Sequence, residues 1–261
     1  GTVLTFFPFP NATRGKRGTR EISIVSFSVP SASLNYWIDR FAKLAIEFDV
    51  SSKKFGYDYI TLFDPDGMKI EIVADPNADM IEGWDNGDLP KEHSIRKFFG
   101  ATFNLNKATE TEKLLSQIMG MSFIKSENNI KRYSSGKDES LCFVDIVENV
   151  NGNYAVSSAG SVHHIAWRTA NDEEQINWRN KFLQAGYHPT EVVDRNYFHS
   201  IYFREPGGIL FEIATDQPGF MVDETFESLG TELKLPPWYE SKRKTIESGL
   251  MPIKTKTSSK K

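Results

Sequence analysis

Two stretches of the chain follow the same plan, and this internal repeat limits the folds that the chain can adopt. Residues 63–72 read FDPDGMKIEI and residues 204–213 read REPGGILFEI, so each places a Pro-x-Gly turn between two strands. Proline presets the first turn residue, and glycine accepts the positive φ of such a turn. When the two prolines are aligned, Glu71 and Glu212 coincide. The chain is therefore predicted to contain copies of one hairpin-bearing unit.

Each hairpin is preceded by an alternating strand and then by a helix. The opening strands are residues 24–29 (IVSFSV) and 162–167 (VHHIAW). The expected helices, with their candidate caps, are 31–46 with Ser31 or Ser33, and 171–186 with Asn171 or Asp172 and Gly186. A fainter copy has a strand at 101–105, a helix at 109–119 and a strand at 141–147. The sequence predicts an α+β fold of repeated βαβββ modules.

The order of these copies gives the expected domain organisation. The opening run Gly1–Phe9 reads as the middle of a strand with no helix before it, so we interpret it as the last strand of a further module whose front, about 50 to 60 residues long by comparison with its sisters, precedes Gly1. The predicted segments are 1–20 as the remnant of the first module, 21–80 as the second, 81–96 as a linker, 97–150 as the third, 151–217 as the fourth, metal-binding module, and 218–261 as a C-terminal helical clasp with a basic tail.

Strand periodicity sorts the candidate site residues by face. Residues two apart in a strand share a face, so Tyr202 and Glu212 lie opposite the apolar residues that alternate with them. His164 falls on the same side if the apolar set of each strand packs beneath the helix. Three chemically active side chains from three strands are then predicted to converge on the open side of the sheet.

A histidine and a carboxylate on neighbouring strands are common ligands of Fe(II), Mn(II) and Zn(II). Two histidines with one carboxylate form the site of non-haem iron oxygenases, and this chain offers His164 and Glu212. The alternative is that the two residues form a buried, hydrogen-bonded pair without a metal. Glu71 is expected to be structural, because Ser26, which is a poor metal ligand, stands where the sequence alignment of the repeats places His164.

Several runs of the sequence closely resemble the hydroquinone-type ring-cleaving, or extradiol, dioxygenases of the glyoxalase (vicinal oxygen chelate) superfamily. They are residues 160–168 (GSVHHIAWR), 194–198 (DRNYF), 200–216 (SIYFREPGGILFEIATD), 218–220 (PGF), 1–8 (GTVLTFFP) and 235–238 (LPPW). The resemblance spans essentially the whole chain. It implies βαβββ modules whose mixed, curved sheets form cups with the helices outside.

The resemblance also implies a mononuclear Fe(II) centre, or Mn(II) in some members, with His164 and Glu212 as ligands. The third ligand of the family is a histidine at the front of the first module, upstream of Gly1. No histidine between Gly1 and Glu92 can replace it. Since loss of one ligand weakens metal binding by orders of magnitude, the 261-residue chain by itself is expected to be impaired or inactive.

Catalytic roles follow from the same resemblance. Tyr202 matches a tyrosine that acts as a hydrogen-bond donor or acid beside the metal-bound substrate oxygen. Arg195 matches an arginine whose positive charge stabilises the phenolate or superoxide. The alternative for Arg195 is a surface salt bridge. His199 is a third catalytic candidate because other extradiol enzymes use an active-site histidine, although strand parity places it opposite Tyr202.

The expected function is Fe(II)-dependent cleavage of hydroquinone or catechol rings by O2, in quinone detoxification or aromatic degradation. Two alternatives keep the same fold: a metal-dependent glyoxalase or isomerase, and a metal-free protein that binds aromatic compounds. The isomerase reading leaves Tyr202 and Arg195 without a role. The aromatic content of 13%, which would suit the binding protein, is also explained by core packing.

Composition restricts the partners. A net charge of −4 argues against a nucleic-acid partner, and no apolar run approaches the roughly 18 residues of a membrane span. The single cysteine, Cys142, excludes an internal disulfide framework and favours a reducing cytoplasm. The expected partners are a small aromatic diol and O2, with homo-oligomer formation left open.

Overall fold

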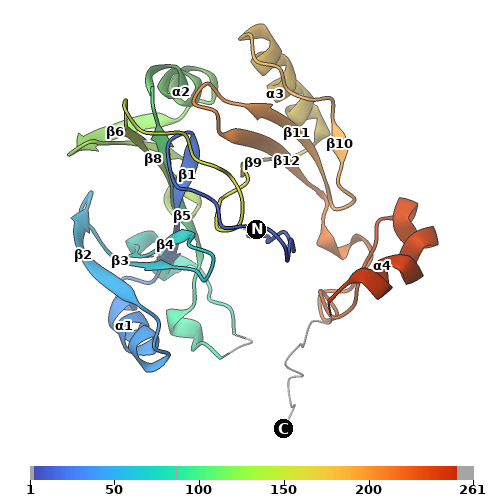
Figure 1. The fold of residues 1–261 in the computed structure, drawn as a ribbon, viewed down its shortest axis with the longest axis horizontal. Helices are drawn as coiled ribbons and strands as arrows, with labels where there is room; N and C mark the ends of the chain where they lie inside the picture. The colour runs from blue at the N-terminus through green and yellow to red at the C-terminus, as the bar shows by residue number, and fades with distance from the viewer. Residues whose placement is uncertain (1–2, 86–87, 252–261) are drawn as a thin grey trace.

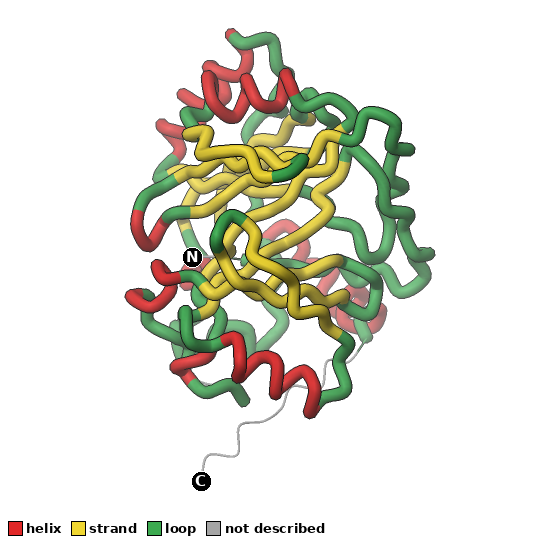
Figure 2. Tube along the Cα trace, turned by 90° about the vertical axis from the view of Figure 1, so that its left-hand side faces the viewer, coloured by secondary structure: helices red, strands yellow, loops and turns green. Residues whose placement is uncertain are grey.

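The computed structural model describes residues 3–85 and 88–251, and its strands form two sheets (Figure 1). The larger sheet has eight strands in the order β2-β3-β4-β1-β5-β8-β7-β6, and the smaller has four in the order β10-β11-β12-β9. The strands lie in the middle of the molecule, with helices toward its top and bottom (Figure 2).

The described chain repeats the order strand, helix, three strands three times. The β1–β4 unit consists of β1 (Glu21–Val29), α1 (Leu34–Lys43), β2 (Phe48–Lys54), β3 (Tyr57–Phe63) and β4 (Lys69–Ala74). The β5–β8 unit consists of β5 (Lys97–Leu105), α2 (Thr109–Lys113) with a π-helical turn (Leu114–Ile118), β6 (Ser122–Glu127), β7 (Ile130–Ser135) and β8 (Cys142–Glu148). The β9–β12 unit consists of β9 (Ile165–Thr169), α3 (Asp172–Gln184), β10 (Val193–Asp194), β11 (Phe198–Arg204) and β12 (Leu210–Pro218). The predicted α+β class is confirmed.

Short helical segments connect and follow these units. They are 3-10 turns at Pro76–Met80, Lys91–His93, Asp138–Ser140, Phe220–Val222 and Pro237–Lys242, and the helix α4 (Arg243–Gly249). Within the predicted clasp two short helices are expected between residues 221 and 249, separated at residues 235–237; the second agrees with Pro237–Lys242 and α4, but the first is wrong, because residues 223–236 form turns and bends. The basic tail predicted for residues 253–261 lies outside the described residues. Within the described ranges, no helix is both long and apolar enough to cross a membrane.

Strand pairing joins the first two units and leaves the third apart. In each unit the first and last strands pair in parallel, as β1 with β4, β5 with β8 and β9 with β12. The antiparallel pairing of β1 with β5 then makes one eight-stranded sheet. The corresponding strand β9 pairs on one side with β12, and among residues 3–85 and 88–251 no strand pairs with its other edge.

The strand predicted for residues 1–9 is wrong for Val3–Phe9, which form no strand, and the first two residues lie outside the description. A strand persists where a neighbouring strand takes up its backbone hydrogen bonds. The first pairings of the chain are instead isolated bridges at Arg14, Lys16 and Thr19, made with residues 154–159. Phe6 and Phe9 are each 70% exposed, so this opening segment presents apolar side chains at the surface.

Packing gives the smaller sheet one apolar face and one polar face. In the β9–β12 unit the side chains of Ile201, Phe203, Phe211 and Ile213 join a core that also contains Phe182 of α3. The same core includes buried residues of the β5–β8 unit, among them Phe103, Leu114 and Ile146. The polar residues that alternate with this apolar set on β11 and β12 are therefore turned to the opposite face.

Candidate functional site

Three strands bring His164, Tyr202 and Glu212 to one face of the smaller sheet. The register pairs Tyr202 of β11 with Glu212 of β12, and Glu212 with Ala166 of β9. His164 lies two residues before Ala166, just ahead of β9, and so projects to the same side. The convergence expected from strand parity is the arrangement that the structure has.

The Glu212 carboxylate divides its contacts between its two oxygens. His164 Nε2 lies 2.7 Å from Oε2, and the Tyr202 hydroxyl donates a 2.7 Å hydrogen bond to Oε1. The hydroxyl of Ser200 also donates to Oε1. The Glu212 side chain is 4% exposed and that of His164 is 23% exposed, so the carboxylate is buried while the imidazole reaches the surface.

These contacts set the pKa values of Glu212 and Tyr202. Burial by itself raises the pKa of the Glu212 carboxyl, but hydrogen bonds from His164, Ser200 and Tyr202 outweigh burial and hold this pKa below its ordinary value. Burial and the hydrogen bond to Glu212 raise the pKa of the Tyr202 hydroxyl. Near neutral pH the site therefore combines a carboxylate anion with a phenol that keeps its proton.

Arg195 extends the hydrogen-bond chain away from Glu212. It lies in the turn between β10 and β11, where its Nε donates a 3.0 Å hydrogen bond to the Tyr202 hydroxyl. Its guanidinium carbon lies 5.1 Å from the centre of the Tyr202 ring. Arg195 therefore belongs to the same cluster as Tyr202, and its partner is this hydroxyl rather than a surface carboxylate.

Ser200 is a contact residue that the sequence analysis did not single out. It is fully buried and donates to the same Glu212 oxygen as Tyr202 does. The available signal was strand parity, because Ser200 lies two residues before Tyr202 and shares its face. A lone serine in a strand carries no chemical signature, so its contact with Glu212 became evident only in the fold.

Neither His199 nor His163 contacts Glu212 as His164 does. His199 Nδ1 lies 2.7 Å from the Asp172 carboxylate at the start of α3, and its backbone N–H donates to the Thr215 hydroxyl. His199 therefore does not join the Glu212 cluster. His163 Nδ1 lies 2.8 Å from His164 Nδ1, and burial together with the neighbouring His164 and Arg204 lowers the pKa of His163.

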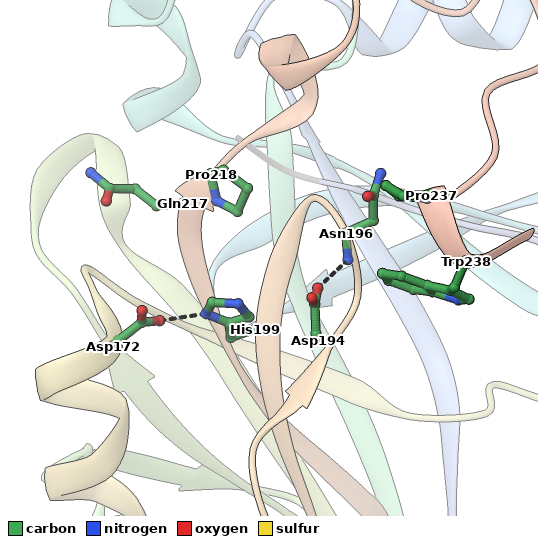
Figure 3. Close-up of a pocket in the computed structure, with 8 residues that line it drawn as sticks. All are labelled: Asp172, Asp194, Asn196, His199, Gln217, Pro218, Pro237 and Trp238. Carbon is green, nitrogen blue, oxygen red and sulfur yellow. Dashed lines mark hydrogen bonds and ion pairs between the residues drawn. The ribbon is translucent and has the colours of Figure 1, made fainter. Parts of the chain in front are cut away.

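An open pocket of about 370 Å³ lies beside His199 (Figure 3). Its lining residues are Asp172, Asp194, Asn196, His199, Gln217, Pro218, Pro237 and Trp238. The lining includes none of His164, Tyr202 and Glu212, so this pocket is separate from the cluster around the carboxylate.

The donor set of the cluster is suited to a first-row divalent metal, but incomplete. His164 Nε2 and Glu212 Oε2 lie 2.7 Å apart, the distance of a hydrogen bond, and the same two atom types are donors that Fe(II), Mn(II) and Zn(II) accept. Within the described ranges, however, no three His, Cys, Asp or Glu side chains are grouped so that they could hold a metal ion. The described residues thus bring one imidazole nitrogen and one carboxylate oxygen together on one face of the smaller sheet.

Comparison of the sequence with known proteins identifies the family of the chain. Residues 97–213 match the Glyoxalase/Bleomycin resistance protein/Dioxygenase superfamily. The chain is 39% identical to the Bacillus subtilis protein MhqO, named as a ring-cleaving dioxygenase, over 98% of this chain and 81% of that protein. It is 33% identical to a chlorohydroquinone/hydroquinone 1,2-dioxygenase of Sphingobium indicum, over 92% of this chain and 76% of that enzyme.

Solved structures agree with the sequence comparison. A crystal structure of a Bacillus subtilis protein described as a dioxygenase superposes with a TM-score of 0.90 at 39% identity, covering 97% of this chain and 81% of that one. Glyoxalase I of Zea mays superposes with a TM-score of 0.55 at 10% identity, over 78% of this chain and 70% of that one, which shows the shared fold alone. The chain therefore belongs to the ring-cleaving dioxygenases of the glyoxalase superfamily.

Proposed function

We propose that the chain acts in the oxidative cleavage of hydroquinone- or catechol-type rings by O2, as an extradiol-type enzyme that uses Fe(II) or, as an alternative, Mn(II). The observation that carries this proposal is the cluster in which His164 and Tyr202 contact different oxygens of Glu212. The named activity of the Sphingobium relative supports an aromatic diol as the substrate class.

In this proposal His164 Nε2 and Glu212 Oε2 hold the metal. The bound metal would supply the redox chemistry that allows O2 to react with an aromatic diol. The hydroxyls of Ser200 and Tyr202 keep the other oxygen of Glu212 occupied, so the carboxylate presents Oε2 to the ligand position. The chain's own contribution is thus to fix the orientation of the carboxylate before the metal binds.

Tyr202 and Arg195 serve the substrate in the proposed mechanism. The raised pKa of Tyr202 keeps a proton on its hydroxyl at neutral pH, and this proton, donated to Glu212 Oε1 in the structure, would turn to a substrate oxygen held at the same face when the substrate binds. Arg195, whose Nε lies 3.0 Å from that hydroxyl, places a positive charge where an anionic oxygen of the substrate would need one. An isomerase mechanism would give neither Tyr202 nor Arg195 a role in the reaction.

The third ligand is proposed to be a histidine from residues that precede Gly1. The support is the two-donor cluster together with the edge of β9 that no described strand pairs. In the larger sheet the corresponding edges of β1 and β5 pair with each other, and the same kind of pairing would join a further unit to the smaller sheet at β9. It follows that the 261-residue chain alone should be nearly inactive.

The test is Fe(II)-dependent O2 uptake with 2-methylhydroquinone, measured on the protein extended upstream of Gly1. His164→Ala and Glu212→Ala should each lower the rate by at least about 100-fold, because each removes a metal ligand. His188→Ala is the matched control, since His188 is an exposed histidine outside the cluster. Unchanged uptake in both ligand variants would contradict the proposed site.

Two further measurements test the requirement for O2 and the proposed upstream ligand separately. Substrate turnover without O2 would favour the isomerase, whereas ring cleavage requires O2. Full uptake by the 261-residue chain, compared with the extended protein, would overturn the proposed upstream ligand and leave the ring-cleaving activity intact.

A further inference from the structure

The pairing of β11 with β12 is interrupted directly beside the proposed metal site. Ser200 pairs with Ala214, whereas Phe198, two residues earlier, pairs with Pro218, four residues later. β12 therefore carries two extra residues at this point, and His199 has no register partner on β12. Because His199 directly precedes Ser200, the position of the Ser200 hydroxyl depends on what holds His199 at the break.

Side chains, rather than the backbone of β12, hold His199 at this break. Gln175 of α3 donates a 2.7 Å hydrogen bond from Nε2 to the His199 carbonyl oxygen. The His199 backbone N–H donates a 3.0 Å hydrogen bond to the Thr215 hydroxyl, and the Asp172 carboxylate lies 2.7 Å from His199 Nδ1. Helix α3 thus supplies two of the three groups that fix this strand residue.

The Gln175 amide joins the two strands that carry the site. Its Nε2 also donates a 2.8 Å hydrogen bond to the carbonyl oxygen of Ile213. The two acceptors are therefore the carbonyl directly before Ser200 and the carbonyl directly after Glu212. An amide nitrogen carries two hydrogens, so one Gln175 side chain links β11 to β12 beside the contact between the Ser200 hydroxyl and the Glu212 carboxylate.

Gln175 is a polar side chain at a core position of its helix. It is fully buried, and its Oε1 has no hydrogen-bond partner among the residues that the structure describes. A buried acceptor without a partner costs stability, so the two bonds donated by Nε2 have to offset that cost. Gln175 stands four residues after the cap Asn171, and the residue four after the cap Ser33 of α1 is Trp37, which packs in an apolar core. Packing a helix on such a sheet therefore does not require the amide.

The β1–β4 unit lacks the histidine as well as the amide. Glu212 pairs with the first strand of its unit at the residue two after His164, and Glu71 pairs with its own first strand at Ser26. The counterpart of His164 is therefore Ile24 rather than the Ser26 that the sequence alignment of the repeats suggested. Ser26 instead donates a 2.6 Å hydrogen bond to Glu71. Of these two units, the one that has the buried amide is the one whose carboxylate has a histidine beside it.

We propose that Gln175 is a positioning residue of the metal site, an inference that rests on the proposed function. By holding β11 and β12 together at the break, it keeps the Ser200 hydroxyl on Glu212 Oε1 and leaves Oε2 directed at the ligand position. Loss of a group that orients a ligand typically weakens metal binding by about 10- to 100-fold. Gln175 acts through two backbone carbonyls, so we expect an effect at the lower end of this range.

The first test measures amide hydrogen exchange in the metal-free 261-residue chain. Gln175→Met keeps the side-chain length and removes both donors, so exchange should become faster selectively in peptides that contain residues 198–202 and 210–214. If Gln175→Met does not fold, Gln175→Asn, whose amide is too short to reach both carbonyls, should give the same local change.

Phe182→Leu is the matched control of this test, because Phe182 is fully buried on the same helix but packs on Phe203 and does not bond to the break. It should not speed exchange selectively in those peptides. Unchanged exchange in the Gln175 variant, or an equal local change in Phe182→Leu, would overturn the role of Gln175.

The second test measures the Kd for Mn²⁺ of the protein extended upstream of Gly1, from the electron paramagnetic resonance signal of free Mn²⁺. Gln175→Met should raise this Kd by about 10-fold and Glu212→Ala by more, while Phe182→Leu should stay close to the wild type. If Glu212→Ala binds Mn²⁺ as tightly as the wild type, the proposed metal site fails and the inference fails with it. If Glu212→Ala loses Mn²⁺ but Gln175→Met keeps the wild-type Kd, the positioning role alone is wrong and the proposed function stands.

Discussion

Glu212 is the residue at which the contacts of the smaller sheet meet. One oxygen faces His164, and the other accepts hydrogen bonds from Ser200 and Tyr202. Because its hydroxyl donors are held by β11, the carboxylate is oriented by the strand pairing itself. Sequence parity was sufficient to place Tyr202 and Glu212 together, but not to assign each donor to an oxygen.

The lowered pKa of Glu212 predicts a specific pH dependence of stability. The ordinary pKa is 4.5, and a folded-state value below it means that the unfolded chain binds the proton more readily. The contribution of Glu212 is therefore present above pH 4.5 and is lost as the pH falls through the folded-state pKa. When the free energy of unfolding is measured with urea between pH 3 and 6, it should fall less steeply with decreasing pH in Glu212→Gln than in the wild type. The exposed control Glu47→Gln should keep the wild-type slope, and an unchanged slope in Glu212→Gln would contradict the assignment.

The N-terminus of helix α3 is stabilised by a side-chain cap and by acidic residues in its first turn. The Asn171 side chain accepts a 2.9 Å hydrogen bond from the backbone N–H of Glu174, and Asp172, Glu173 and Glu174 lie in the first turn. Acidic residues at this end interact favourably with the helix dipole. Of the two caps proposed from the sequence, Asn171 is the one used. Asp172 instead contacts His199, which holds that histidine beside the helix.

Asn171→Ala should destabilise the protein by about 1 kcal/mol, because the Glu174 N–H loses its capping acceptor. The free energy of unfolding from chemical denaturation measures this change. Asn177→Ala is the matched control, since Asn177 is an exposed residue within α3 where alanine is well tolerated. A loss in Asn177→Ala as large as that in Asn171→Ala would argue against the cap.

At the scale of the molecule, one core connects the two sheets. Phe211 of β12 is fully buried, and its ring centre lies 5.8 Å from that of Phe103 in β5. A hydrogen bond from the Thr111 hydroxyl to the buried Glu205 carboxylate links α2 to the β11–β12 turn. These contacts give the β5–β8 and β9–β12 units a common interior rather than two separate ones.

Phe211→Ala should therefore lower the stability of the whole molecule, by about 3 to 5 kcal/mol. We expect one cooperative transition at a lower denaturant concentration, seen alike by circular dichroism and tryptophan fluorescence. Phe226→Ala, at a 65% exposed position, should leave the transition nearly unchanged. Two separate transitions, with only one shifted by Phe211→Ala, would contradict a shared core.

The sequence by itself determined the unit plan, because a Pro-x-Gly turn, a strand period of two and a capped helix are local properties that recur along the chain. It also placed His164, Tyr202 and Glu212 on one face. Only the tertiary structure decided that Val3–Phe9 form no strand, since a strand depends on a neighbour distant in sequence. It likewise decided that Ser200 contacts Glu212 and that Ile24, not Ser26, corresponds to His164, because strand register is set by pairing between segments and not by either segment alone.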